Sequence, residues 1–278
     1  MEKATRCAIF WNTFKQKKCD AEVLFDAFSA HGIAVTEAVD EADFAVSMGG
    51  DGTFLTTAMR VGEKQIPILG INTGRLGFLA DFSLADIMQT LDNLQAGLLR
   101  QERCNVLQVE YNEGAGGKGR GSGMQGYPFA LNEVAVLKRD NSSMISIRAS
   151  LNGEYLTTYQ ADGLIVNTPT GSTGYALSVG GPVILPGSQN IGLVPVAPHG
   201  LTVRPLMLPD NLEVTLTVES RSHNFLVAID GRSESCQDST TLTIRKAPYQ
   251  VVALKRPETT FLHTLRSKLL WGSDARNH

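Results

Sequence analysis

The sequence predicts an α/β domain followed by a β-rich domain, on two observations. Over about the first hundred residues, strand-like and helix-like patterns alternate, which is typical of parallel βα units. After Cys104, valine, threonine and tyrosine become more frequent and apolar residues recur at every second position, which indicates strands. We therefore expect an N-terminal α/β domain over 1–104, to which 255–278 return, and a β-rich domain over 105–254.

In the N-terminal part, short apolar runs predict strands over 8–11, 33–39, 44–48 and 66–71. Apolar residues at helical spacing predict a helix over 20–31 that ends at Gly32. A second helix is expected over 83–95, with Ser83 as its N-cap. A third helix-like run covers 54–61.

In the C-terminal part, apolar alternation predicts strands over 106–111, 129–137, 145–151, 155–159, 212–218, 225–229, 242–244 and 251–254. Asn152-Gly153 is typical of a type I′ hairpin turn. An amphipathic helix is expected over 261–271. The glycine-dense segment 112–126 predicts a loop; its GxGxxG match lacks the strand before and the helix after that a dinucleotide site requires.

Composition excludes several classes of protein. The chain has 278 residues, a net charge of −3 and 42% hydrophobic residues, so it can bury a core and lacks the basic character of a nucleic-acid binder. Its apolar runs are too short to span a bilayer, and the N-terminus does not resemble a signal peptide. The four cysteines are scattered without a CxxC pair, so we expect reduced thiols in a cytoplasmic protein.

The segment Gly49-Gly50-Asp51-Gly52-Thr53 directly follows the apolar run 44–48. Ligands of α/β sheets bind beyond the carboxyl ends of strands, and glycines allow the backbone to approach a phosphate closely. The start of the following helix offers N–H donors to an anion, while Asp51 offers a carboxylate that can accept a hydroxyl proton or hold a metal. A tight turn that only joins strand to helix explains this segment equally well when it is considered alone.

The segment from Ala161 to Tyr175 reads ADGLIVNTPTGSTGY, a carboxylate followed by an apolar strand and a dense set of hydroxyls and glycines. So many small polar groups can surround a polar ligand, and Tyr175 offers a face for a flat heterocycle. Apolar residues on both sides of the loop disfavour a solvated Ser/Thr turn.

Asn132 and Glu133 are neighbours in a strand-like run. Neighbouring strand residues point to opposite faces of a sheet, so we expect one side chain to bond a base edge or ribose while the other supports it. Considered alone, a solvent-facing pair is the more common explanation for such residues.

These segments, together with Asn72–Phe78 (NTGRLGF), occur in an order that resembles the NAD kinase family. The resemblance extends over most of the chain, from the first strand to Arg256. The pairing of GGDGT with DGLIVNTPTGSTGY is specific, whereas GGDGT alone is shared with diacylglycerol, sphingosine and phosphofructokinase-type kinases.

The resemblance implies an enzyme that transfers the γ-phosphoryl group of ATP, or in some members of inorganic polyphosphate, to the 2′-hydroxyl of the adenosine ribose of NAD. The products are NADP and ADP. It also implies Mg²⁺ or another divalent metal, whose ligands in this chain stay unassigned. The implied fold is a Rossmann-like N-terminal α/β domain and a β-sandwich-like C-terminal domain, with the final helix packing back on the first domain. Bacterial members are cytoplasmic homodimers or homotetramers.

The resemblance also implies roles for single residues. Asp51 matches the general base, and the phosphate-binding positions match Gly49, Gly50, Gly52 and Thr53. Contacts to NAD are implied for Asp51, Gly52, Asn132, Glu133, Asp162, Thr173, Gly174, Tyr175, Ala176, Leu177, Ser178 and Ala197.

Three positions depart from the family's pattern. Gly174 replaces the usual alanine of GSTAY, and Arg232 follows Asp230-Gly231 where Gln or Asn is common. Gln160 stands where some relatives have a basic residue, which leaves the preference between NAD and NADP open. No contact to NAD is therefore assigned to Arg232.

Two other functions stay as alternatives. A lipid or sugar kinase would share only GGDGT, and the Asn132-Glu133 pair and the 162–175 segment disfavour it. A non-catalytic sensor would bind NAD or NADP without turnover, and the intact Asp51 disfavours it. In the kinase interpretation, Asp51 can serve as base, as metal ligand or as both.

Overall fold

The structure is a computed structural model that describes residues 5–11, 18–74, 77–113, 127–139, 143–238 and 240–272. The chain divides into two compact units: unit 1 contains 1–103 and 251–278, and unit 2 contains 104–250. Both divisions fall inside long strands, β6 (Arg100–Glu113) and β17 (Thr240–Lys255). The boundaries expected from the sequence, 104/105 and 254/255, lie slightly further along the chain.

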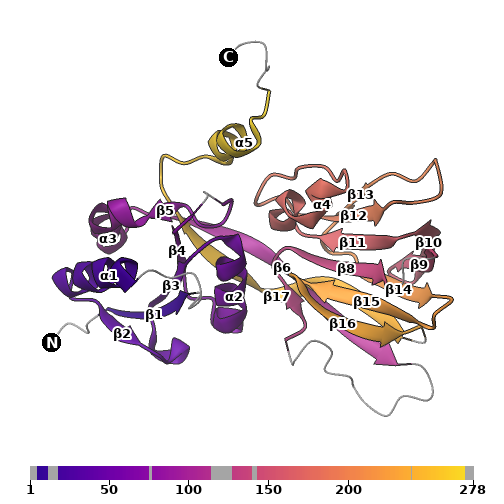
Figure 1. Ribbon diagram of the computed structural model, residues 1–278, viewed down its shortest axis with the longest axis horizontal. Coiled ribbons are helices and arrows are strands. Elements are labelled where there is room, and N and C mark those ends of the chain that lie inside the picture. The colour runs from indigo at the N-terminus through magenta and orange to yellow at the C-terminus, as the bar shows by residue number, and fades with distance from the viewer. Residues whose placement is uncertain are drawn as a thin grey trace. The chain divides into compact units, whose positions relative to one another are not determined.

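Unit 1 is a parallel sheet with helices, as expected for alternating strands and helices (Figure 1). Its strands follow the order β2-β1-β3-β4, and the end of β17 pairs in parallel with β4, as does the short β5. The strands are β1 (Arg6–Trp11), β2 (Ala34–Thr36), β3 (Phe44–Met48), β4 (Ile68–Asn72) and β5 (Phe82–Ser83). The helices are α1 (Lys18–Ala30), α2 (Asp51–Val61), α3 (Ile87–Gln95) and α5 (Phe261–Leu269).

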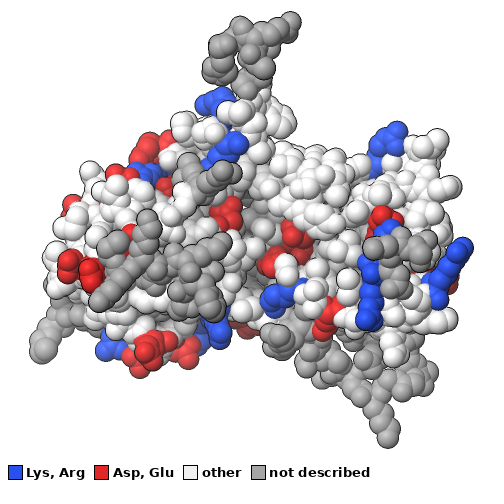
Figure 2. Space-filling view, in the orientation of Figure 1, with Lys and Arg blue, Asp and Glu red and all other residues white. Residues whose placement is uncertain are grey.

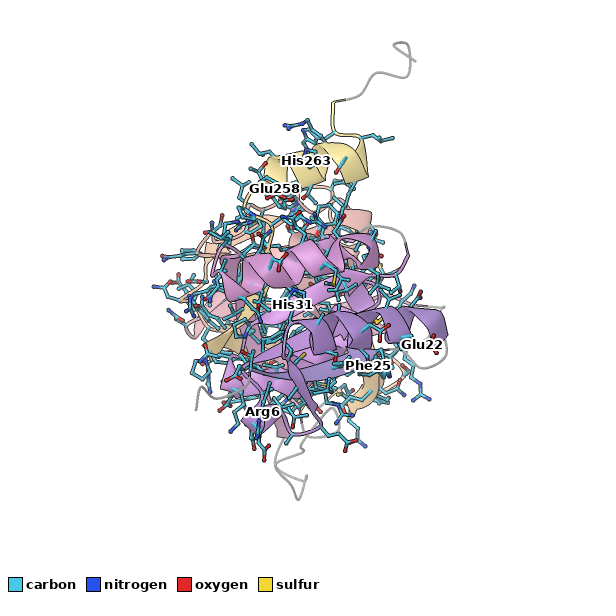
Figure 3. All side chains as sticks on the ribbon, turned by 90° about the vertical axis from the view of Figure 1, so that its left-hand side faces the viewer. Arg6, Glu22, Phe25, His31, Glu258 and His263 are labelled. Carbon is cyan, nitrogen blue, oxygen red and sulfur yellow. The ribbon has the colours of Figure 1, made fainter. Side chains whose placement is uncertain are left out.

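The apolar runs of unit 1 form its core. Every residue of β3 is buried, which is typical of a parallel strand that is covered on both faces. His31, at the end of α1, lies between α1 and α3 (Figure 3), with its Nε2 atom 3.1 Å from Oδ1 of Asp92 on α3. The core beneath these helices includes Leu24, Phe28, Val46, Leu69 and Leu91.

Unit 2 contains two sheets that share one core. In the first, β10-β9-β14 continue into the first part of β17, and β6 pairs with β17 and β7; the second has the order β13-β12-β11-β8-β15-β16. The strands are β7 (Phe129–Ala130), β8 (Glu133–Lys138), β9 (Ile145–Leu151), β10 (Glu154–Ala161), β11 (Gly163–Asn167), β12 (Asn190–Val196), β13 (Leu206–Pro209), β14 (Val214–Glu219), β15 (Asn224–Ile229) and β16 (Arg232–Gln237).

The core of unit 2 explains why its strands alternate. In β14 and β15 every second residue is buried, and these residues meet others from both sheets in a single apolar cluster. Two antiparallel sheets that bury alternate side chains against each other form a β-sandwich. The fold expected from the sequence is therefore confirmed for both units, and α5 belongs to unit 1 as expected.

Several expected elements are present with different limits. The run 129–137 is two strands, because the chain bends at Leu131 and Asn132, whose amides bond to Asp230. The runs 242–244 and 251–254 are parts of one strand, β17. β16 was not predicted, because its sequence, RSESCQ, is polar apart from one cysteine.

The expected N-cap at Ser83 is wrong. Its hydroxyl donates to the side chain of Asp86 at 2.9 Å, a 3₁₀ turn covers Leu84–Asp86, and α3 begins only at Ile87. The Asn152-Gly153 turn is confirmed, with positive φ angles of 47° and 83° that match a type I′ turn. Most of the loop over 112–126, including the GxGxxG match, lies outside the described residues. In the described parts of the chain, no helix combines the length and apolar character needed to cross a membrane.

Replacing Phe225 by alanine should destabilise unit 2 strongly. Phe225 has 0% of its surface exposed and packs in the core between the two sheets. Removing a buried aromatic ring leaves a cavity, so we expect the free energy of unfolding to fall by about 3–5 kcal/mol. Urea unfolding measures this change. Leu201→Ala, at a side chain that is 88% exposed, is the control and should change stability by less than about 0.5 kcal/mol; similar losses in both variants would contradict the assigned core.

Candidate functional site

The glycine-rich segment 49–53 forms the turn between β3 and α2. Helix α2 begins at Asp51, and its N-cap, Gly50, has no side chain to bond the first helical amides. A Cβ atom at Gly50 or Gly52 would meet no atom within 4 Å, so space is open beside the backbone at the start of the helix. Because the first amides of a helix attract anions, this turn can accept a phosphate.

The Asp51 carboxylate is held by the loop that follows β4. Its Oδ2 atom accepts the N–H of Phe78 at 2.8 Å, and its Oδ1 atom accepts the N–H groups of Leu79 at 3.0 Å and Ala80 at 3.4 Å. A Cβ atom at position 77 would overlap Oδ1 of Asp51, so only glycine fits there. Three main-chain donors thus fix a half-buried carboxylate beside the phosphate-type turn.

Lys255, at the end of β17, holds the same loop from its carbonyl side. The Lys255 side chain is buried, and its Nζ atom donates to the carbonyls of Phe78 at 2.9 Å and Leu79 at 3.1 Å. The amides of this loop therefore bind an anion while its carbonyls bind a cation. This arrangement satisfies both sets of main-chain groups and keeps the loop in one conformation.

In unit 2, Asp230 positions the Asn132-Glu133 pair. Asp230 and Gly231 form the turn between β15 and β16, with positive φ angles of 46° and 80°. The Asp230 carboxylate accepts the N–H groups of Leu131 at 2.7 Å, Asn132 at 2.8 Å and Glu133 at 3.1 Å. Burial raises the pKa of Asp230, and these amides and the nearby Arg232 oppose that shift.

Thr168 holds the same segment from the other side. Its hydroxyl donates to the carbonyl of Leu131 at 2.6 Å, and its N–H donates to the carbonyl of Asn132 at 2.9 Å. With the main chain satisfied, Oδ1 of Asn132 and Oε2 of Glu133 are buried, and the described residues provide no hydrogen-bond partner for either atom. Buried polar atoms of this kind normally have a partner, so they mark a place where a ligand can bond.

The pair and the GSTGY turn meet in the structure. The main-chain N–H of Tyr175 lies near the Glu133 carboxylate and lowers its pKa. A Cβ atom at Gly174 would lie 3.0 Å from Oε2 of Glu133 and 3.4 Å from Nδ2 of Asn132, so both side chains face this turn. The expectation that they point to opposite faces of a strand is therefore wrong, because β8 begins only at Glu133 and Asn132 lies in the bend that Asp230 holds.

Burial raises the pKa of Glu133 to about 7, and the negative charge of Asp230 adds to the shift. Glu133 has only 9% of its surface exposed, so water solvates its charged form poorly. A carboxyl group of this kind changes protonation near neutral pH, and a bound ligand that donates a hydrogen bond would favour its charged form.

The rest of the GSTGY turn is rigidly built. A 3₁₀ turn (Thr170–Thr173) leads into the short helix α4 (Tyr175–Ser178), in which Ala176 is buried and Tyr175 is exposed. The hydroxyl of Ser172 donates to the carbonyl of Pro169 at 2.6 Å and accepts the N–H of Ile184 at 2.9 Å. This turn therefore presents its remaining polar groups from a fixed backbone.

Asp162 and Ala197 lie at the other end of β11. Strand pairing sets Asn167 opposite Glu133 and Gly163 opposite Val196, so five strand positions, roughly 17 Å, separate Asp162 from the residue that pairs with Glu133. Asp162 forms an ion pair with Lys138 at 2.7 Å, and Ala197 has a positive φ of 43°. Lys138 and Gln160 also line a cavity of about 700 Å³ together with Ser146, Glu219, Arg221 and His223.

Arg232, the departure noted after Asp230-Gly231, has a structural contact. Its guanidinium donates to the carbonyls of Tyr127 at 3.1 Å and Phe129 at 3.0 Å and lies over the Tyr127 ring at 5.4 Å. These contacts hold the start of β16 against the residues that lead into β7.

Models of protein families match the chain in two segments. The ATP-NAD kinase N-terminal domain matches residues 10–99, and the ATP-NAD kinase C-terminal domain matches residues 131–256. The chain belongs to the NAD kinase family. An NAD kinase of Bacteroides fragilis is 50% identical over 97% of this chain and 99% of its own length, and one of Porphyromonas gingivalis is 42% identical over 85% of this chain and 79% of its own.

Solved structures of this family share the fold. An NAD kinase from Archaeoglobus fulgidus in complex with ATP has a TM-score of 0.76 and 29% identity, covering 91% of this chain and 95% of its own. The yeast NADH kinase complexed with NADH has a TM-score of 0.84 at 19% identity, covering 97% of this chain and 89% of its own, which shows a common fold.

Three residues with clear roles in this geometry were not assigned from the sequence. Gly77 lies within the NTGRLGF segment that the resemblance used, and the Asp-Gly step at Asp230 was recognised, but neither pattern reveals which atoms it contacts. Lys255 gives no signal at all, because a lysine at the end of a strand is usually exposed.

The raised pKa of Glu133 predicts a pH-dependent stability difference. The folded-state pKa of about 7 lies above the ordinary glutamate value of 4.5, so the folded state binds more protons over this range and is stabilised at low pH. That stabilisation is lost as the pH rises from about 4.5 to 7. Glu133→Gln removes this titration. Relative to that of the wild type, the free energy of unfolding of the variant should therefore rise by up to about 3 kcal/mol between pH 5 and 8.

Urea unfolding at several pH values measures this difference. Glu154→Gln, at an exposed position on β10, is the control for removing a carboxylate. Parallel pH profiles for the wild type and Glu133→Gln would show that the folded state does not perturb Glu133.

Proposed function

We propose that the protein is an NAD kinase that transfers the γ-phosphoryl group of ATP to the 2′-hydroxyl of the adenosine ribose of NAD, giving NADP and ADP. Both family domains and relatives that are 50% and 42% identical support this function. The observation that carries it is the Asp51 carboxylate, fixed by three amides at the start of α2 beside an open glycine turn.

Asp51 acts as the general base. A ribose hydroxyl is a weak nucleophile, and a carboxylate can take its proton as the new oxygen–phosphorus bond forms and the bond to the leaving ADP breaks. The three amides hold Asp51 for this step, so little reorganisation is needed when the hydroxyl binds. General base catalysis accounts for about 10²–10⁴ of the rate, and positioning and charge stabilisation supply the remainder.

The phosphates of ATP bind at the glycine turn. Gly49, Gly50, Gly52 and Thr53 surround the start of α2, whose amides and dipole favour negative charge. Mg²⁺ or another divalent metal, when bound, neutralises charge on the phosphates. The described residues contain no group of three metal-binding side chains. In this proposal the metal is held mainly by phosphate oxygens, and Asp51 is the protein carboxylate closest to the phosphates.

NAD binds through polar atoms of unit 2 for which the described residues provide no partner. Oδ1 of Asn132 and Oε2 of Glu133 accept hydrogen bonds from the coenzyme, while the Gly174-Tyr175 backbone forms the adjacent wall. The further NAD contacts of this proposal are Gly52, Thr173, Ala176, Leu177, Ser178, Asp162 and Ala197, together with Asp51.

The proposal includes three properties that rest on the resemblance. They are a cytoplasmic location, a homodimeric or homotetrameric assembly, and inorganic polyphosphate as an alternative donor. The relative from Archaeoglobus fulgidus in complex with ATP supports ATP as the donor.

Asp51→Asn should lower turnover by at least about a hundredfold, because the amide cannot take the proton. NAD should still bind, since the contacts assigned to it in unit 2 are unchanged. The assay incubates the protein with ATP, Mg²⁺ and NAD and detects NADP with an NADP-specific dehydrogenase, and calorimetry measures NAD binding. Comparable turnover in the variant would reject Asp51 as the base. A wild-type protein that binds NAD but makes no NADP would favour the sensor alternative.

Glu133→Ala and Asp162→Ala should chiefly weaken NAD binding. Each removes a carboxylate assigned to the coenzyme, and losing one hydrogen bond to a charged group typically weakens binding by about ten- to a hundredfold. Calorimetry with NAD tests both variants, and Glu154→Ala, an exposed carboxylate at the start of β10, is the control. An unchanged NAD affinity in both variants would show that the assigned contacts are wrong.

A further inference from the structure

Phe78 connects the Asp51 carboxylate to the C-terminal helix. Its N–H donates to Asp51 at 2.8 Å, and its carbonyl accepts from Lys255 at 2.9 Å. Its ring contacts α5: the Phe261 ring lies 6.3 Å away, and Nζ of Lys268 lies 5.2 Å from the centre of the Phe78 ring. One loop residue therefore contacts the carboxylate through its main chain and α5 through its side chain.

Helix α5 uses one face for this contact. Phe261, Leu265 and Lys268 are four and seven positions apart along the helix, which places them on the same side. Leu265 is buried, whereas Arg266 and Ser267 are exposed. Basic side chains show at the surface over α5 (Figure 2), where Arg266 and Lys268 are the cationic residues.

Among the residues that the structure describes, no carboxylate contacts the Lys268 ammonium. Within the described ranges no Asp or Glu oxygen lies at ion-pair distance from Lys268, whereas Arg256 pairs with Asp86 at 2.8 Å and Lys255 is bonded to carbonyls. Burial lowers the pKa of Lys268, the positive charge of Lys255 lowers it further, and the charges of Asp51 and Asp81 oppose the shift. Lys268 and Asp51 therefore contact the same residue, Phe78, the lysine through the ring and the aspartate through the main-chain N–H.

We propose that Lys268 binds a terminal phosphate of the phosphoryl donor beside Asp51. The proposal rests on the function proposed above, and it assigns a residue of α5 to the binding of the phosphoryl donor. A carboxylate next to a triphosphate repels it, and a nearby ammonium offsets this repulsion. Lysine suits the task because its compact charge sits on a flexible stem and binds phosphate as a point charge. Both family models end before α5, the second at residue 256, so neither includes this residue.

The stacking on Phe78 explains how a flexible lysine stays near the site. A cation over an aromatic face at a partly exposed site is held only weakly, so the ammonium can leave the ring when a stronger anionic partner arrives. A phosphate oxygen is such a partner, since charge-assisted hydrogen bonds are stronger than a cation–π contact at a partly exposed site.

Lys268→Gln tests the proposal, because it removes the charge and keeps most of the stem. With saturating NAD, we expect the KM for ATP to rise by about tenfold or more, the loss typical of one charge-assisted contact, while the KM for NAD changes less than about twofold. Lys268→Arg should retain most of the affinity for ATP. Arg266→Gln, which removes the same charge from the exposed side of the helix, is the matched control and should leave both constants unchanged.

Binding without turnover gives a second measurement. Calorimetry with inorganic tripolyphosphate should show weaker binding to Lys268→Gln than to the wild type or Arg266→Gln. An unchanged KM for ATP, or an equal effect of Arg266→Gln, would overturn the proposal. A loss of thermal stability with parallel increases in both KM values would also overturn it, since it would indicate that Lys268 only anchors the helix. If the wild type makes no NADP from ATP and NAD, the proposed function itself fails, whatever the variants show.

Discussion

Hydrogen bonds from main-chain amides to two aspartate carboxylates organise the candidate residues of both units. In unit 1 a loop fixes a side chain: the amides of residues 78–80 hold Asp51. In unit 2 a side chain fixes a loop, since Asp230 gathers the amides of residues 131–133. A partly buried carboxylate needs such donors to stay charged, and the donors in turn need an acceptor.

The two arrangements leave different groups available for chemistry. Around Asp51 the loop carbonyls are also satisfied, by Lys255, so the carboxylate is the reactive group that the loop presents. Around Asn132 and Glu133 the main chain is satisfied by Asp230 and Thr168, and the described residues provide no partner for Oδ1 of Asn132 or Oε2 of Glu133. Binding then costs little conformational entropy, because the residues that meet the ligand are ordered before it arrives.

The sequence predicted most of the fold because its signals are local. Apolar runs, alternation and the Asn152-Gly153 turn each act over a few residues, and the structure contains the corresponding strands and hairpin. The motifs also singled out Asp51, Asn132 and Glu133, whose roles stay predictions. What it could not predict are contacts between distant residues: Asp230 bonds to residues 97 to 99 positions away, and Lys255 to residues 176 and 177 positions away. The orientation of Asn132 follows from such a contact, which no local pattern contains.

The turn at Asp230 restricts that position to one kind of amino acid. Its left-handed backbone is tolerated by glycine, asparagine and aspartate, and by few others. The side chain at position 230 must also accept three main-chain N–H groups. This requirement excludes glycine, which has no acceptor, and disfavours asparagine, whose amide nitrogen would face a donor. Only aspartate meets both the backbone requirement and the need for an acceptor. A laboratory library randomised at residue 230 should therefore return aspartate almost exclusively.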